Sequence, residues 1–220
     1  MLKPRLEILP PSQRRLWDEM LGAIPADFVL YGGTALALRL GHRASEDFDF
    51  FSNRSFLPAD LEAQVPFLAG AERIQSSPNT LVSLVEREGP VKVSFFGGLT
   101  LHRVGDPEPA EENGVLVASL LDLAATKVKV VQDRAEAKDY LDISRLLEEG
   151  TELSEALGSA QAVYGSAFNP LLSLKALCYF VDGDLPTLSP NVQKRLTEAA
   201  QEVNPDRLPE LTTLPGGLTP

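Results

Sequence analysis

Two aspartates separated by a single residue, Asp47 and Asp49, are the side chains in this sequence best suited to chemistry. They alternate with Phe48 and Phe50, so a β-strand, in which side chains repeat every two residues, would place both carboxylates on one face. Two carboxylates at that separation repel each other unless a cation lies between them. Hard oxygen ligands, few in number, suit Mg²⁺ that is shared with substrate phosphates. The pattern therefore predicts a metal site, and the alternative is a solvated strand edge.

A pair of glycines lies upstream of the aspartates and is a candidate phosphate site. Gly32 and Gly33 follow an apolar run at residues 28–31 that predicts a buried strand. Glycine lets the backbone turn tightly and approach a ligand without a Cβ in the way. Thr34 is predicted to cap a helix that Gly41 ends, and the start of such a helix leaves N–H groups that bind anions. For the glycine pair alone, the alternative is an ordinary tight turn.

The loop before the aspartates adds two polar candidates. Arg43 is a forked donor suited to phosphate, and Ser45 would hydrogen-bond either the loop backbone or a phosphate. Together with the glycines and aspartates, these residues resemble the nucleotidyltransferase superfamily. The finer resemblance is to the AbiEii/AbiGii toxin family, in which Gly-Gly-Thr-Ala-Leu precedes an Arg-x-Ser-x-Asp-hydrophobic-Asp segment. Here that second segment runs over residues 43–49.

A second group of candidates lies in a predicted helical region from Ser119 to about Glu149. Lys127 falls on the same arc as the apolar residues of its helix, although a lysine charge is costly to bury without a partner. Either its stem reaches water or it faces a polar cleft, and we favour the cleft. The apolar pattern shifts phase after about Arg134, which predicts a break in the helix there.

This second group also resembles the toxin family, which carries a helical lysine followed by an Arg-x-x-x-Lys-Asp-x-x-Asp segment. Lys127, Arg134, Lys138, Asp139 and Asp142 occupy those positions. The resemblance implies that the basic residues face the nucleotide and its phosphates. For Lys138, Asp139 and Asp142, the alternative is a helix surface with salt bridges between successive turns. The resemblance covers two separated blocks, in the order that the family has them.

One position departs from the superfamily pattern. Active nucleotidyltransferases usually place a third carboxylate on a later strand beside the aspartate pair, where it completes the metal site or serves as a base. The predicted strand at residues 91–96 has Ser94 at that position, and serine is a weaker metal ligand and a poor base. Lys92 shares a strand face with Ser94, and we interpret it as a surface residue that could add charge to the site. This departure weakens the case for two metals, whereas one metal on the aspartate pair would still orient a triphosphate.

The composition limits the classes of function that remain. The 220 residues carry a formal charge of −11 and have an isoelectric point near 4.7, which argues against nonspecific binding to nucleic acid, so no DNA partner is expected. No apolar run is long enough to span a bilayer, so no membrane partner is expected. Cys178 is the single cysteine, which excludes an intramolecular disulfide and fits the reducing cytoplasm as the location.

The elements that must position these groups follow from the apolar pattern. Residues 73–76, 81–86 and 91–96 read as strands, the last two as a hairpin, and residues 115–117 as a further short strand. Helices are predicted at 12–21, 57–65, 153–163, 171–180 and 191–202, with Ser12 as the cap of the first. The last dozen residues are predicted to be loosely held. We expect a core at 1–105, a helical lobe at 106–185 that completes the active-site cleft, and a proline-rich helix and tail at 186–220.

The resemblance implies an α/β (α+β) fold of the nucleotidyltransferase type, a small mixed sheet with flanking helices followed by a C-terminal helical lobe. The activity implied is Mg²⁺-dependent transfer of a nucleoside monophosphate from an NTP to an acceptor, which in this family can be the 3′ end of tRNA, by a toxin that a cognate antitoxin protein restrains. Two alternatives stay open: a protein AMP- or UMP-transferase, and a catalytically degenerate nucleotide-binding module. The implied site has catalytic Asp47, Asp49 and Lys127, of which the aspartates bind the metal, and substrate-binding Gly32, Gly33, Thr34, Arg43, Ser45, Ser94, Arg134, Lys138, Asp139 and Asp142.

Overall fold

The computed structural model describes residues 1–220, which divide into two compact units. The first unit contains Met1–Leu101, Asp106–Ser119 and Leu214–Pro220. The second unit contains His102–Gly105 and Leu120–Thr213. The chain therefore begins in the first unit, enters the second briefly at residues 102–105, forms the rest of the second from Leu120, and returns to the first with residues 214–220.

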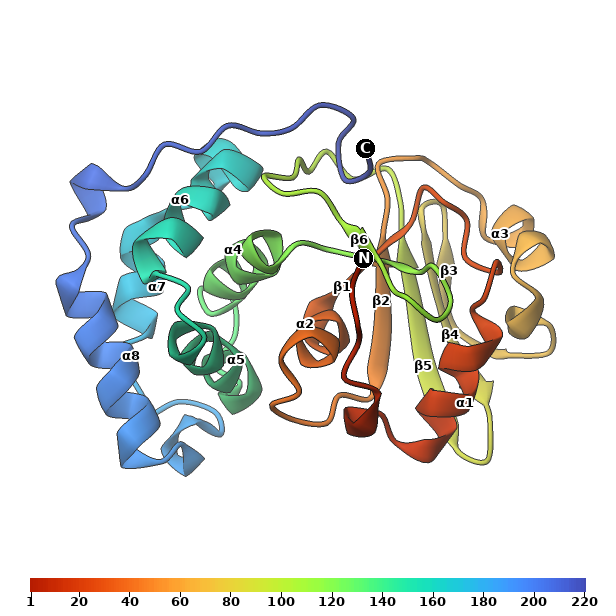
Figure 1. The fold of residues 1–220 in the computed structure, drawn as a ribbon, viewed down its shortest axis with the longest axis horizontal. Coiled ribbons are helices and arrows are strands. Elements are labelled where there is room, and N and C mark those ends of the chain that lie inside the picture. Colours follow the sequence, from red (N-terminus) through yellow and green to blue (C-terminus); the bar gives the residue numbers. More distant parts are fainter. The chain divides into compact units, whose positions relative to one another are not determined.

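The first unit is built on a mixed sheet of seven strands. The strands are β1 (Val29–Tyr31), β2 (Asp47–Phe51), β3 (Glu72–Ser77), β4 (Thr80–Glu86), β5 (Pro90–Phe96), β6 (Glu108–Pro109) and β7 (Leu116–Val117). Their order across the sheet is β3-β4-β5-β2-β1-β7-β6 (Figure 1). β2 is antiparallel to β1 and parallel to β5, and β1 is parallel to β7. The predicted mixed sheet is confirmed.

Aromatic stacking holds the centre of this sheet on one face. Phe48 and Phe50 alternate with the aspartates of β2 and are fully buried. Trp17 stacks on Phe48 with ring centroids 6.0 Å apart, and Phe50 stacks on Phe95 at 5.1 Å. Such pairs contribute about 0.5–1.5 kcal/mol each beyond the burial of their area. Because a slip of one residue would expose these rings, they fix the register that turns both aspartates to the opposite face.

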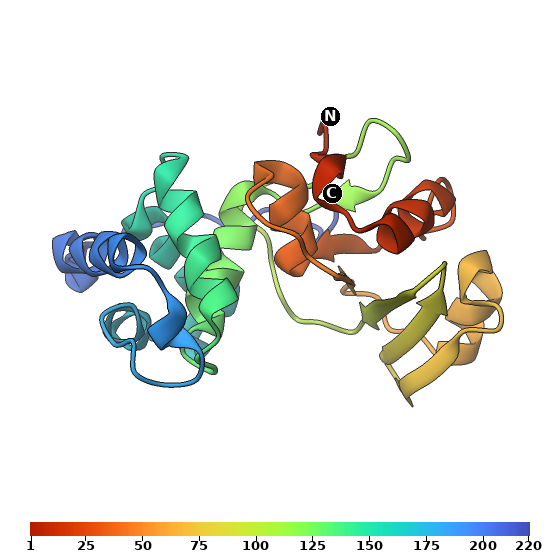
Figure 2. The same cartoon turned by 90° about the horizontal axis from the view of Figure 1, so that it is seen from below.

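Three α-helices accompany the sheet in the first unit: α1 (Pro11–Glu19), α2 (Gly32–Leu40) and α3 (Pro58–Gln64). α1 and α2 lie on the same side of the sheet (Figure 2), and Trp17 of α1 stacks there on Phe48 of β2. Gln13 of α1 is buried there, with Nε2 3.5 Å from the hydroxyl of Thr34 in α2. The two helices thus cover one face of the sheet at β2 and β5.

Two of the predicted helix caps are wrong. The N-cap of α1 is Pro10 rather than Ser12, because a proline suits the first helical position and starts the helix one residue earlier. The N-cap of α2 is Tyr31 rather than Thr34, and neither true N-cap makes a side-chain cap bond. The predicted end of α2 is confirmed, since Gly41 adopts a left-handed φ of 63°.

The last residues of the chain belong to the first unit. Leu218 is 1% exposed, and its N–H donates to Oδ1 of Asn53, which follows β2. The Asn53 amide in turn donates to the carbonyls of Leu99 at 2.6 Å and Leu101 at 2.8 Å. The prediction of a loosely held tail is therefore wrong for residues 214–220, because one buried leucine outweighs the prolines and glycines around it.

The second unit is helical. Its α-helices are α4 (Leu120–Val130), α5 (Ala137–Glu148), α6 (Leu153–Tyr164), α7 (Pro170–Ala176) and α8 (Pro190–Glu202). The predicted break near Arg134 is confirmed, because a turn separates α4 from α5. α7 ends at Ala176 rather than at Phe180, since the N–H groups of Cys178 and Tyr179 bond to carbonyls three residues back and close the helix in a tight turn. α4 packs against α5 and α6.

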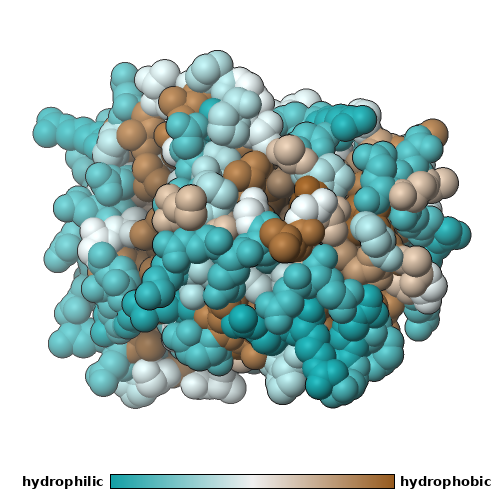
Figure 3. Space-filling model, turned by 45° about the vertical axis from the view of Figure 1, so that its right-hand side comes forward, coloured by the Kyte–Doolittle hydropathy of each residue, from teal (hydrophilic) through white to brown (hydrophobic).

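Short 3₁₀ helices complete the secondary structure: η1 (Leu6–Ile8), η2 (Pro66–Leu68), η3 (Gly165–Ala167), η4 (Leu185–Thr187) and η5 (Pro205–Arg207). None of the helices has the length and apolar character needed to cross a bilayer. On the side that Figure 3 brings forward, apolar patches interrupt a largely polar surface.

Candidate active site

The turn from β1 into α2 forms a glycine corner, which we define as Gly32 and Gly33. Gly32 has a φ of 74°, a left-handed value that glycine adopts without strain. α2 begins at this residue, and its N-cap, Tyr31, makes no side-chain bond to the first turn. The first amides of a helix lack intrahelical partners, and the helix dipole makes this end positive. The corner therefore has the features of an anion site.

Asp49 lies against this corner. A Cβ placed on Gly32 would be 2.7 Å from Oδ2 of Asp49. The reason is the sheet register, in which Asp49 pairs with Tyr31, the residue just before Gly32. A side chain at position 32 would force the Asp49 carboxylate to move from this position. The structure thus brings Asp49 and the glycine turn together, and Asp47 lies on the same strand face as Asp49.

Arg43 and Ser45 lie against the second glycine. A Cβ on Gly33 would be 2.7 Å from Nη2 of Arg43 and 3.1 Å from Oγ of Ser45. Arg43 also donates from Nη1 to the carbonyl of Ala44 at 2.9 Å, which holds the guanidinium near the loop. A cation and a hydroxyl therefore stand beside the positive end of α2, where each is suited to a phosphate oxygen.

Thr34 joins the helix to the loop before β2. Its side chain is 1% exposed, and its hydroxyl donates to the backbone carbonyl of Asp47. The hydroxyls of Thr34 and Ser45 are also hydrogen-bonded, with the oxygens 2.9 Å apart. Thr34 therefore fixes the position of the strand that carries the aspartates, and its hydroxyl is turned into the protein.

The strand β5 supplies the neighbours of both aspartates. In the parallel pairing of β2 with β5, Asp47 lies beside Lys92 and Asp49 lies beside Ser94. Lys92 Nζ is 2.8 Å from Oδ2 of Asp47, and both side chains are about 40% exposed (40% and 41%). Ser94, by contrast, is 2% exposed. The serine thus occupies the position where the sequence pattern leads one to expect a third carboxylate.

The aspartates of β2 suit a metal ion that takes only some of its ligands from the protein and the rest from the substrate. The described chain has no group of three or more His, Cys, Asp or Glu side chains that could enclose a metal. Asp47 and Asp49 offer carboxylate oxygens from one strand face. Mg²⁺ is commonly bound by one or two carboxylates, with phosphates and water completing its octahedron. Two carboxylates beside an anion site meet that requirement.

In the second unit, Lys127 is buried and held by two aspartates. It is 5% exposed, and its Nζ lies 2.7 Å from both Oδ1 of Asp139 and Oδ2 of Asp142. Both aspartates are fully buried. Two carboxylates offset the cost of removing the ammonium from water, and they join α4 to α5.

Arg134 and Lys138 complete the set from the second block. Arg134 donates from Nε to Oδ2 of Asp139 at 2.8 Å, and its side chain is 45% exposed. Burial acts to raise the pKa of Asp139, but the hydrogen bond from Arg134 and the charge of Lys127 outweigh it and hold that pKa below its ordinary value. Lys138 lies on the surface, with Nζ 2.8 Å from Glu136. The structure therefore gathers Lys127, Arg134 and both aspartates, and Lys138 is linked to them only through Glu136, which also lies 3.5 Å from Nε of Arg134.

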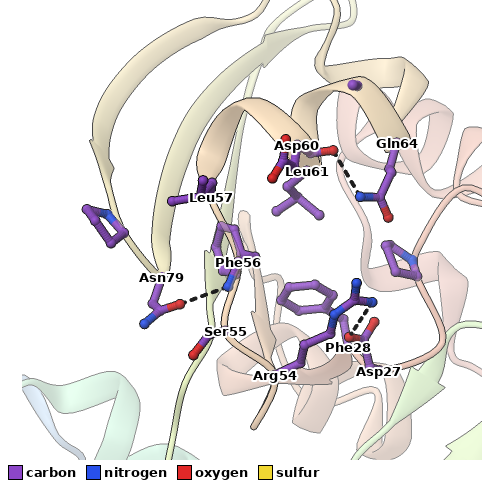
Figure 4. Close-up of a pocket in the computed structure, with 13 residues that line it drawn as sticks. Asp27, Phe28, Arg54, Ser55, Phe56, Leu57, Asp60, Leu61, Gln64 and Asn79 are labelled. Atoms are coloured by element: carbon purple, nitrogen blue, oxygen red, sulfur yellow. Dashed lines mark hydrogen bonds and ion pairs between the residues drawn. The ribbon is translucent and has the colours of Figure 1, made fainter.

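A separate pocket of about 610 Å³ opens in the first unit at the other end of the β1–β2 pair (Figure 4). Phe28 and Phe56 form its apolar part, with ring centroids 5.6 Å apart, and Arg54 is ion-paired with Asp27 at 3.2 Å on its rim. Phe28 precedes β1, whereas the glycine corner follows it. None of the residues predicted for the nucleotide site lines this pocket.

A mixed sheet in which a glycine turn leads into a helix, with an acidic pair on the adjoining strand, defines the nucleotidyltransferase class. A family model described as nucleotidyl transferase AbiEii toxin, type IV toxin–antitoxin system, matches residues 15–211. The chain therefore belongs to this family of nucleotidyltransferase toxins. Membership implies an NTP substrate and an antitoxin counterpart.

The chain is also similar to one further protein in sequence and to two solved structures in fold. The Aquifex aeolicus (strain VF5) protein aq_aa25 is 30% identical over 178 residues, which cover 79% of this chain and 84% of the relative. The fold is similar to that of MenT4, a nucleotidyltransferase toxin of Mycobacterium tuberculosis H37Rv, with a TM-score of 0.60, 14% identity, and 87% and 84% of the two chains covered. It is also similar to a crystal structure from H. pylori described as a nucleotidyltransferase, with a TM-score of 0.57, 18% identity, and 85% and 91% covered.

Two features of the site are not visible in the sequence patterns alone. The ion pair between Lys92 and Asp47 depends on which strand lies beside β2, and that pairing joins residues far apart in sequence. The complete burial of Asp139 and Asp142 is also unexpected, because their spacing from Lys138 suits an exposed helix. The signal that could have revealed it is Lys127, whose place in an apolar stripe requires a buried acidic partner.

Proposed function

We propose that the protein transfers a nucleoside monophosphate from an NTP to an acceptor hydroxyl, with Mg²⁺ bound by Asp47 and Asp49. The observation that carries the proposal is the meeting of Asp49 with the glycine corner, within 2.7 Å of a Cβ on Gly32. An anion site and a pair of metal-binding carboxylates are thereby adjacent. A metal and a triphosphate need that arrangement, because the metal takes part of its ligands from the phosphates.

The triphosphate would bind along the glycine corner. The first amides of α2 and the guanidinium of Arg43 supply positive charge, and the Ser45 hydroxyl supplies a further hydrogen bond. Thr34 is a positioning residue, since its buried hydroxyl holds the backbone of Asp47. Ser94 would border the site beside Asp49.

The reaction is a displacement at the α-phosphorus. The acceptor hydroxyl oxygen forms a bond to that phosphorus, the bond from phosphorus to the α–β bridging oxygen breaks, and pyrophosphate leaves, while the hydroxyl proton passes to water. Mg²⁺, when bound, neutralises phosphate charge as it builds on the leaving group. Asp47 and Asp49 hold the ion, and Arg43 stabilises the charge on the phosphate oxygens.

For the second unit, the proposal gives Arg134 the task of countering triphosphate charge. Lys127, which the family resemblance would also place at the phosphates, is buried between Asp139 and Asp142 and positions α4 against α5. Asp139 and Asp142 would then act as positioning residues, because they hold the Lys127 ammonium at 2.7 Å. The half-exposed Arg134 side chain is better suited to meet a phosphate than the buried Lys127. Lys138 would bind substrate from the surface.

The acceptor that we propose is the 3′ end of tRNA, in the cytoplasm. The purified protein would be incubated with lysate and each of the four α-³²P-labelled NTPs, and RNA would then be separated from protein. We expect label on RNA and release of pyrophosphate with wild type, and neither with Asp49→Asn. Label on protein instead would indicate an AMP- or UMP-transferase. The matched control is Glu46→Gln, which removes an exposed carboxylate from the residue just before β2.

A second candidate function is favoured by Ser94. Without a third carboxylate, the protein could have kept its phosphate site and lost turnover, which would make it a nucleotide-binding module. NTP binding without pyrophosphate release at high protein concentration would support that reading. Toxicity is tested by growth of cells that express wild type or Asp49→Ala, and equal growth of both would count against it.

A further inference from the structure

Lys92 stands beside the candidate metal site with one acidic partner. On β2 its neighbour in register is Asp47, and on β4 it is Leu84. The Lys92 ammonium is 2.8 Å from Oδ2 of Asp47, the only ion pair that either side chain makes. One Asp47 oxygen is thus occupied by a cation of the protein itself.

The charge of this strand face differs from that of a site built for two metals. Asp47 and Asp49 contribute −2 and Lys92 contributes +1, so these three side chains sum to −1. A third carboxylate at position 94 and an uncharged residue at 92 would give −3 instead. The guanidinium of Arg43, beside Gly33, is a further positive charge near the site. A second divalent cation here would lack a ligand at Ser94 and would lie near an ammonium, which repels it.

We propose that Lys92 supplies the fixed positive charge that a second metal ion would otherwise supply, so that this site binds one divalent cation per chain. The inference rests on the proposed function, because it concerns the same pair of aspartates. Lys92 is a positioning residue that acts through Asp47. It orients that carboxylate, reduces the negative charge that attracts cations, and leaves the second Asp47 oxygen for an ion.

This role predicts two effects of opposite sign for Lys92→Gln. Removing a competing cation should tighten Mn²⁺ binding roughly fivefold, the scale of one exposed charge interaction. Label transfer should fall, because the fixed positive charge is lost while the phosphates still have to be neutralised. An ordinary surface ion pair would alter neither quantity measurably.

The test counts Mn²⁺ bound to the full-length protein by electron paramagnetic resonance, with Mn²⁺ as the only added ligand. We expect one site in wild type, one tighter site in Lys92→Gln, and a second site in Ser94→Asp. Lys92→Arg keeps the charge and should bind Mn²⁺ as wild type does. The matched control is Lys129→Gln, which removes a lysine 2.7 Å from Asp133 in the second unit and should leave Mn²⁺ binding unchanged.

The outcomes separate this inference from the function on which it rests. Two Mn²⁺ sites in wild type, or unchanged affinity in Lys92→Gln, would overturn the role of Lys92 even if label transfer is observed. One Mn²⁺ site that tightens in Lys92→Gln, without any label transfer, would support the charge role and count against the transferase function. A circular dichroism spectrum of each variant checks that it has folded.

Discussion

The two units each contain a Lys–Asp pair of nearly the same length in very different surroundings. In the first unit, Lys92 and Asp47 are 2.8 Å apart with side chains 40% and 41% exposed. In the second, Lys127 and Asp139 are 2.7 Å apart with side chains 6% and 0% exposed. Exposed pairs contribute about 0–1 kcal/mol, whereas breaking a buried pair costs about 3–5 kcal/mol. Burial, rather than distance, therefore separates a pair that can open for a ligand from one that holds two helices together.

The largest expected effect concerns catalysis in the first unit. Asp49→Asn should lower label transfer by roughly 10²–10³-fold or more, the scale seen when a group that stabilises a transition state is removed. Thermal unfolding should change little, because the Asp49 side chain is only partly buried. Label transfer and the melting temperature would be measured on the same preparation. Either a retained transfer rate or a large drop in melting temperature in this variant would contradict the comparison between the units.

The next effect concerns stability in the second unit. Asp139→Ala should lower the free energy of unfolding by about 3–5 kcal/mol, because it leaves the buried Lys127 with one carboxylate instead of two. Asp133→Ala is the matched control, since Asp133 pairs with Lys129 at 2.7 Å but is 63% exposed. Its cost should stay below about 1 kcal/mol. Urea denaturation of both variants would test the difference, and equal costs would contradict it.

A pair of glycine variants separates backbone strain from loss of the site. Gly32 and Gly22 have similar left-handed φ values of 74° and 64°, so alanine at either should cost about 1–2 kcal/mol. Only at Gly32 would the new Cβ meet Asp49, at 2.7 Å, since nothing lies within 4 Å at Gly22. Label transfer should therefore fall in Gly32→Ala and persist in Gly22→Ala. Similar losses of transfer in both would show that strain alone is responsible.

Acid should act on the second unit through Asp139. The folded state lowers the pKa of this carboxyl, so its contribution to stability is present above the unfolded value of about 3.9 and is lost as the pH falls through the folded pKa. Helical circular dichroism should therefore decline more steeply below about pH 4 in wild type than in Asp139→Asn. Both proteins would be titrated with acid. If their helical signals decline with the same slope, a group other than Asp139 is responsible.

The smallest expected effect is that of Lys138→Ala. Lys138 pairs with Glu136 at 2.8 Å on the surface, and such pairs contribute about 0.2–1 kcal/mol. The stability of this variant should therefore match wild type within that range. Its label transfer is the informative quantity, because a loss without destabilisation would support substrate binding by Lys138, and an unchanged rate would remove it from the site.

Local patterns allowed much of the fold to be predicted. The alternation of aspartate and phenylalanine identified β2, and Gly41 marked the end of α2, because each feature depends only on neighbours in sequence. The phase shift near Arg134 likewise revealed the break between two helices. What escaped prediction depends on contacts between distant segments. The two-residue strand β6 is too short for a pattern, and it forms because Glu108 and Pro109 meet β7.

The site shows the same division between local and distant information. Glycines, arginine and aspartates in fixed order indicated a phosphate and metal site, and the structure places Arg43 and Asp49 beside the two glycines. The partner of Asp47 could not be predicted, because Lys92 reaches it only through the pairing of β2 with β5. The helix surface given as the alternative for Asp142 is wrong, because Asp142 lies fully buried against Lys127.

The return of residues 214–220 to the first unit bears on when the enzyme matures during synthesis. Leu218 reaches Asn53, directly after the strand that bears both aspartates, so this strand acquires its final support only when that leucine has emerged from the ribosome. A nascent chain halted anywhere in the helical unit would contain every proposed metal ligand but would lack the contact between Leu218 and Asn53. The strand that bears both aspartates would therefore gain this contact only after the helical unit has been synthesised.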